Sequence, residues 1–111
     1  MADATYVHGT QDKIDYTPTS ATDAGTVIVQ GDLVGITNLD IEADRLGALS
    51  ISGVWDITKD TSTAHTVGQK VYWDDTNKKL TTTASGNKRI GTVLEAADAA
   101  AETARVLLVT V

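Results

Sequence analysis

Short runs of apolar residues separated by turn-forming residues cover most of the chain, and this pattern predicts strands rather than helices. Residues 26–29 read Thr-Val-Ile-Val, Gly31-Asp32 is a turn signal, and residues 33–37 form a second apolar run. We therefore expect a strand, a turn and a strand. Residues 48–57 alternate between apolar and polar side chains, which predicts a half-buried strand with a bulge or kink at Gly53.

The second half of the chain continues this pattern. Further strands are expected within residues 67–74, 80–83, 89–94 and 104–109. Residues 74–79 contain Asp, Asn and Lys, which predicts a tight reversal and a hairpin. The alanine-rich residues 95–103 are open between a loop and a helix of one or two turns, because alanine favours helix but so short a helix is marginal alone. Residues 38–47 are expected to be a connection that can include a turn of helix.

The N-terminal segment differs in character from the rest. Residues 1–25 are polar and contain the only proline, Pro18. Such a segment is either an arm that orders on a partner or a first strand followed by a loop. We expect an N-terminal arm or extended segment at residues 1–25 and a single β-domain at residues 26–111. The fold class expected is all-β, a small β-sandwich or partly open β-barrel with at most one or two short helical turns.

Composition and charge narrow the range of functions. The chain has 111 residues, a net charge of −6, no cysteine and no phenylalanine. Its core must therefore be mainly aliphatic, and a thin core of this kind gains stability when subunits assemble. The negative charge disfavours nucleic acid as a partner. No segment resembles a membrane helix or a cleaved signal, so we expect no membrane partner and synthesis in the cytoplasm.

No residue pattern predicts a catalytic, cofactor-binding or metal site. Asp74, Asp75 and Asn77 lack the remainder of a calcium-binding loop, so a solvated hairpin tip is expected there. His8 and His65 have no partner at the spacing of metal ligands, and exposed loop positions are expected for both. We expect no enzyme activity, because few aromatic residues are available to wall a pocket that would raise the pKa of a carboxyl group.

The aromatic residues allow two interpretations. Trp55, Tyr72 and Trp73 can pack in the core, which is the favoured role, or form a subunit or ligand interface. Interfaces favour Trp and Tyr because these side chains bury a large area and keep one polar group.

Several segments resemble one known family. They are GQKVYWD at residues 68–74, KLTTT at 79–83, GN at 86–87, IGTVLEA at 90–96, VQGDLVGI at 29–36 and GVW at 53–55. In order and spacing they are similar to the capsid decoration, or cement, proteins of tailed bacteriophages. That family was formerly labelled a domain of unknown function and is encoded among phage and prophage head genes.

The resemblance implies a compact, β-tulip-like domain that binds the outer surface of the phage head in the virion. It implies homotrimers at threefold and quasi-threefold positions and an N-terminal arm that contacts the major capsid protein. The candidate arm residues are Tyr6, Val7, Ile14 and Tyr16. No cofactor and no small-molecule substrate are expected. The alternative is a small β-barrel that binds a saccharide or peptide, with Trp55 or Trp73 as a stacking platform.

Overall fold

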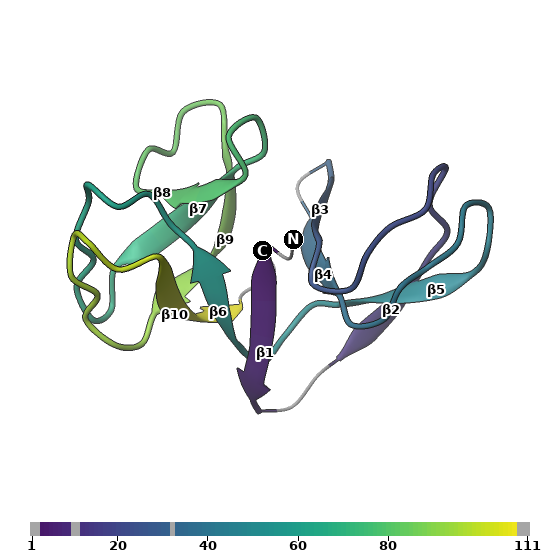
Figure 1. The fold of residues 1–111 in the computed structure, drawn as a ribbon, viewed down its shortest axis with the longest axis horizontal. Helices are drawn as coiled ribbons and strands as arrows, with labels where there is room; N and C mark the ends of the chain where they lie inside the picture. The colour runs from purple at the N-terminus through teal and green to yellow at the C-terminus, as the bar shows by residue number, and fades with distance from the viewer. Residues whose placement is uncertain (1–2, 10–11, 32, 109–111) are drawn as a thin grey trace.

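The computed structural model describes residues 3–9, 12–31 and 33–108. In these residues it has ten strands and no helix, and the strands form two antiparallel sheets (Figure 1). The six-stranded sheet has the order β1-β6-β10-β9-β7-β8, and the four-stranded sheet has the order β2-β5-β4-β3. The strands are β1 (Ala4–His8), β2 (Lys13–Tyr16), β3 (Val27–Gln30), β4 (Leu33–Thr37), β5 (Gly47–Ser50), β6 (Val54–Thr58), β7 (Lys70–Asp74), β8 (Lys79–Thr81), β9 (Lys88–Val93) and β10 (Thr103–Leu108). The all-β prediction is confirmed.

Both hairpins predicted from turn residues are present. β3 pairs with β4, and β7 pairs with β8. In the second hairpin the Asp74 carboxylate accepts hydrogen bonds from the backbone N–H groups of Thr76 and Asn77, at 3.0 and 3.1 Å. Residues 95–103 form a loop apart from the first residue of β10, which resolves the choice between loop and helix. Residue 109 of the expected last strand and Asp32 of the first turn lie outside the described residues.

The single strand expected over residues 48–57 is wrong. The segment forms two strands in different sheets, because β5 pairs with β2 and β4 whereas β6 pairs with β1 and β10. Gly53, between them, has a φ of 105°, in the left-handed region that glycine adopts without steric cost. The residue expected to kink one strand is therefore at the point where the chain passes from one sheet to the other.

The N-terminal segment supplies one of the two outer strands of each sheet. β1 pairs with β6, and β2 pairs with β5. Asp3 fixes the start of β1, since its side chain accepts a 3.1 Å hydrogen bond from the backbone N–H of Val27 and its carbonyl accepts one of 3.0 Å from the N–H of Thr58. Residues 1–25 of the chain alone thus include a first strand, β1, as one of the two interpretations of this segment predicts. Action of residues 1–25 as an arm on a partner stays a prediction.

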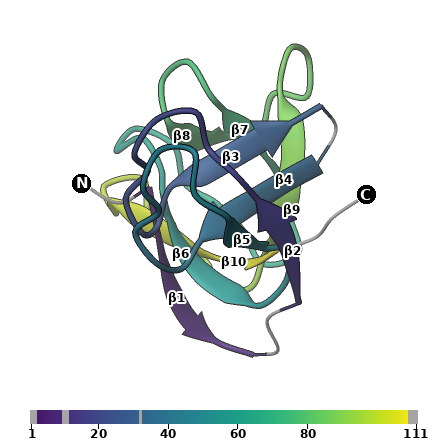
Figure 2. The same ribbon diagram turned by 90° about the vertical axis from the view of Figure 1, so that its right-hand side faces the viewer.

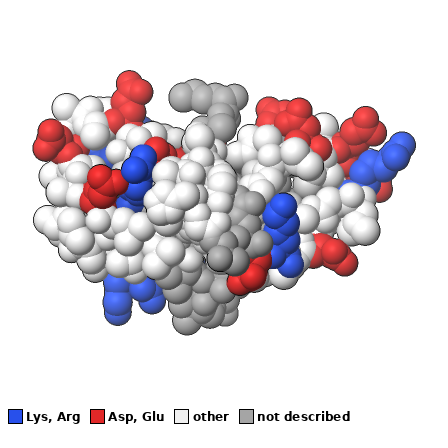
Figure 3. All heavy atoms as spheres, turned by 90° about the horizontal axis from the view of Figure 1, so that it is seen from below, with Lys and Arg blue, Asp and Glu red and all other residues white. Residues whose placement is uncertain are grey.

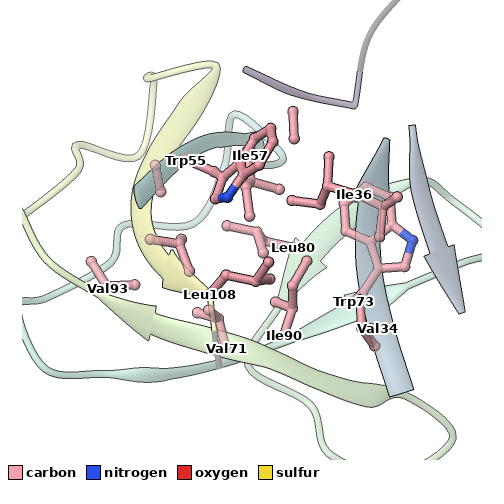
Figure 4. Close-up of a cluster of buried hydrophobic side chains, with 14 residues drawn as sticks. Val34, Ile36, Trp55, Ile57, Val71, Trp73, Leu80, Ile90, Val93 and Leu108 are labelled. Atoms are coloured by element: carbon pink, nitrogen blue, oxygen red, sulfur yellow. The ribbon is translucent and has the colours of Figure 1, made fainter. Parts of the chain in front are cut away.

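The main core lies between the six-stranded sheet and the β3–β4 hairpin (Figure 4). Its largest side chains are Trp55 and Trp73, surrounded by Val, Ile, Leu and Ala. The six-stranded sheet curls, because Lys59, just after β6, forms an isolated bridge with Leu80 of β8. The β2–β5 pair lies at the far end of the molecule from this core (Figures 1 and 2), and Leu49 is buried there outside the main cluster.

Candidate interaction surfaces

The four candidate arm residues lie on one outer strand of each sheet, so the structure divides them into two pairs. Tyr6 and Val7 are on β1, at the edge of the six-stranded sheet, and Ile14 and Tyr16 are on β2, at the edge of the four-stranded sheet. Tyr6 is 41% exposed and the other three are partly buried. Outer strands offer backbone groups to a further strand, so the segment carries two places where a partner can add to a sheet.

Tyr6 is also tied to the core of its own chain. Its ring meets that of Trp55 edge to face, with the ring centroids 5.3 Å apart. Its hydroxyl donates a hydrogen bond to the backbone carbonyl of Gly9. One side of the Tyr6 ring therefore covers Trp55, and the other side of the Tyr6 ring faces solvent.

The two tryptophans occupy core positions, as the favoured interpretation had it. Each is 1% exposed. The indole N–H of Trp55 donates to the carbonyl of Ser52 at 3.1 Å, and that of Trp73 donates to the Asp75 carboxylate at 3.1 Å. Neither buried ring is available as a stacking platform for a saccharide. Of the three aromatic candidates, only Tyr72 has partial access to solvent in this chain.

Lys59 is buried, which the sequence did not indicate. The side chain is 2% exposed, and its Nζ lies 2.8–3.1 Å from the backbone carbonyl oxygens of Asp60, Asp98, Ala99 and Ala101. Three N–H groups are thus shared among four acceptors. This ammonium group holds the alanine-rich loop in one shape.

The expectation that His65 is exposed is wrong. His65 is 2% exposed, and its Nδ1 lies 2.8 Å from Oε1 of Gln69. Its backbone exchanges two hydrogen bonds of 2.9 Å with Ala97 of the alanine-rich loop, so the loop is joined to the segment that carries His65. His8, at the end of β1, is exposed as expected.

Arg105 organises the carboxylates on the outer face of the six-stranded sheet. Its guanidinium group contacts Asp56 at 3.0 Å and Glu95 at 3.0 Å. The hydrogen bond to Asp56, helped by the two negative charges, raises the pKa of Arg105 above its ordinary value. Since Arg105 is charged at all ordinary pH values, it forms lasting ion pairs with these two carboxylates.

Two aspartates belong to turns rather than to a catalytic pair. The pKa of Asp60 is lowered mainly by a hydrogen bond from the backbone N–H of Ser62, and to a smaller extent by one from the Ser62 hydroxyl. The side-chain amide of Asn77 is the main cause that lowers the pKa of Asp74. A general acid needs the opposite shift. Within the described residues, no group of three or more His, Asp or Glu side chains could hold a metal ion.

The clearest hollow lies beside the loop that joins β4 to β5. It has a volume of about 430 Å³, and its floor includes Ile41, which is 7% exposed. Leu39 and Leu46, at 75% and 71% exposed, border it. Figure 3 shows one side of the molecule, on which acidic and basic groups lie close to one another and are separated by uncharged side chains.

Comparison with known proteins gives one match. A profile of the family described as "Phage cement protein" matches residues 7–108. Searches of curated proteins and of solved structures found no significant match. Among the described residues, no helix is long and apolar enough to cross a membrane.

Proposed function

Because the chain belongs to the phage cement protein family, we propose that it binds the outer surface of a phage head as a homotrimer and stabilises the shell. The family match is the observation that carries this proposal. The major capsid protein is the proposed partner. The role is structural and not enzymatic, and it needs no cofactor, nucleic acid, membrane or small-molecule substrate.

The form of the chain supports such a role. The apolar core is small, and several large apolar side chains remain exposed, among them Leu39, Leu46 and Val67. Neighbouring subunits could cover surface of this kind and add the burial that a small domain lacks. In a trimer, three weakly binding copies would act together, because binding of the first raises the effective concentration of the other two.

The N-terminal segment, residues 1–25, is the proposed contact with the major capsid protein. It provides one outer strand of each sheet, β1 and β2, and it carries Tyr6, Val7, Ile14 and Tyr16. An extended segment of the shell protein could pair with either strand through backbone hydrogen bonds. Partly exposed aromatic and aliphatic side chains would then supply the specific contacts.

Binding to shells tests the proposal directly. Purified protein is added to shells assembled from the major capsid protein of the same phage, and uptake and the temperature of shell rupture are measured. We expect saturable uptake, in multiples of three copies per threefold site, and a higher rupture temperature. Light scattering should give the mass of a trimer. Absence of uptake would contradict the proposed function, and a monomer at high concentration would contradict the trimer.

The contribution of the segment is tested with two matched substitutions. Tyr16→Ser changes a partly buried side chain of β2, and Leu94→Ser changes an apolar side chain outside residues 1–25 that is 37% exposed. We expect the first to weaken uptake about tenfold and the second to have little effect. Equal uptake by the two variants would place the contact elsewhere.

A further inference from the structure

The outer face of the six-stranded sheet carries a group of basic and apolar side chains from three neighbouring strands. In β7, Val71 and Trp73 are buried in the core, so Lys70 and Tyr72 point to the outer face. Lys70 lies opposite Thr92 of β9, and Tyr72 lies opposite Arg89. Thr92 in turn lies opposite Leu107 of β10, which is 40% exposed. We call Lys70, Tyr72, Arg89, Thr92 and Leu107 the outer patch.

A bulge in β9 places Arg89 in this patch. The partner of Val71 is Gly91 and the partner of Tyr72 is Arg89, so Ile90 is an extra residue in β9. Ile90 is fully buried. In a regular ladder Ile90 would lie opposite Tyr72 on the outer face, and Arg89 would share the inner face with Trp73. The bulge thus buries the isoleucine and directs the arginine outward, as bulges commonly re-aim a side chain.

Arg89 keeps unused hydrogen-bonding capacity. Its Nη2 donates to the hydroxyl of Thr92 at 3.1 Å, while its Nε is buried and has no partner among the described residues. Neither Arg89 nor Lys70 forms an ion pair with a carboxylate in that part of the chain. Asp74, on the same face of β7, is engaged with Thr76 and Asn77 in the turn.

The lack of ion pairs at Lys70 and Arg89 in the described residues is unusual, because the chain is acidic overall. The sequence has 15 acidic residues and 9 basic ones, so carboxylates are in excess, yet among the described residues none forms an ion pair with Arg89 or Lys70. An unsatisfied guanidinium donor is costly when partly buried and gains most from a carboxylate, whose two oxygens match its planar fork. Tyrosine and arginine are also the residues most enriched among strong contributors to protein interfaces.

We propose that the outer patch is a docking surface for an acidic protein surface, in which a carboxylate pairs with Arg89, a second one with Lys70, and apolar groups pack on Tyr72 and Leu107. This inference rests on the proposed function, under which the acidic surface belongs to the major capsid protein. A nucleic acid is disfavoured as the occupant, because a chain of net charge −6 whose outer patch contains two cations neutralises few phosphates.

Two arginine substitutions provide a matched test. Arg89→Ala removes the patch arginine, and Arg45→Ala removes an exposed arginine of the β4–β5 loop. Both change the net charge equally and both remove an arginine side chain. With the shells described above, we expect Arg89→Ala to weaken binding about tenfold or more and Arg45→Ala to leave it nearly unchanged. The double variant K70A/R89A should also lose most of the salt dependence of binding.

The outcomes separate the two proposals. If the unmodified protein does not bind shells, the proposed function fails and this inference fails with it. If it binds and Arg89→Ala binds equally well, only the outer patch is refuted, provided that thermal unfolding shows the variant to be folded. Self-association that K70A/R89A abolishes, without change in shell binding, would assign the patch to a second copy and overturn the inference. If the unmodified protein binds duplex DNA, and K70A/R89A abolishes that binding without changing shell binding, the patch would bind a nucleic acid and the inference would be overturned.

Discussion

The ammonium group of Lys59 donates a hydrogen bond of 2.9 Å to the backbone carbonyl of Ala101, forty-two residues later in the chain. Three further carbonyls share the same group. One side chain thereby adds to the few backbone hydrogen bonds of the alanine-rich loop. We expect this loop to depend on Lys59 more than on any of its own side chains.

Lys59→Met should therefore destabilise the protein by about 3 kcal/mol, because methionine fills a similar volume but removes the ammonium group that donates to four carbonyls. Lys79→Met, at an exposed position of β8, should change stability by less than about 0.5 kcal/mol. Urea unfolding of the two variants measures the difference. Equal stability would mean that water satisfies the carbonyls.

Tyr6→Ala should cost about 1–2 kcal/mol, because it removes the edge-to-face contact with Trp55 and a hydrogen bond. It should also change the fluorescence of Trp55 by opening its ring to water. Tyr6→Phe keeps the ring and should lose only about 1 kcal/mol with little change in fluorescence. Thermal unfolding with fluorescence detection separates the two effects, and identical spectra for both variants would contradict the covering role of the ring.

Gly91→Ala should be among the most damaging single substitutions. A Cβ atom at this position would lie 2.1 Å from the carbonyl oxygen of Leu107 and 2.6 Å from Cγ1 of Val106. The first of these atoms is backbone of β10 and cannot move without disturbing the sheet, so a loss of about 3 kcal/mol or more is expected. Gly86 has a φ of 77° but open space around it, so Gly86→Ala should lower the free energy of unfolding by about 1–2 kcal/mol. Denaturant midpoints compare the two.

The lowered pKa of Asp74 predicts how its contribution to stability depends on pH. The hydrogen bonds from Asn77 and Thr76 hold this pKa below its ordinary value of 3.8. A carboxyl group whose pKa is lowered on folding stabilises the protein above its unfolded value and loses that contribution as the pH falls through the folded value. The stability difference between the unmodified protein and Asp74→Ala should therefore be larger at about pH 6 than at about pH 2.5. A difference that is independent of pH would show that the turn does not depend on the ionised form.

Local patterns were sufficient to predict most strands and both hairpins. β7 and β8 follow from alternation and from a turn of Asp, Asn and Lys, which act within a few residues of one another. The division of residues 48–57 was not predictable in this way, because both halves have strand character and the change of sheet depends on distant pairing partners. Propensity and alternation do not encode which strand lies next to which.

The burial of the candidate site residues was likewise predictable where it depends on the residue type and not where it depends on distant partners. The burial of Trp55 and Trp73 was the favoured interpretation because large aromatic side chains seek the core. Lys59 and His65 were not expected to be buried, since lysine is rarely buried and histidine is ordinarily partly exposed. Their burial arises from carbonyl and amide groups far along the chain. The bulge at Ile90 was likewise not foreseen, although an arginine beside an isoleucine and a glycine in one strand is a pattern that could have suggested it.

The pairing of β1 with β6 also has a consequence for the order in which the chain acquires its structure. The hydroxyl of Thr58 donates to the carbonyl of Asp3, fifty-five residues away, so β1 cannot form its pairing with β6 until the residues of β6 have been made. Contacts between such distant residues slow folding because a long loop must close first. A nascent chain would thus hold β1 without its partner strand while the intervening residues are translated.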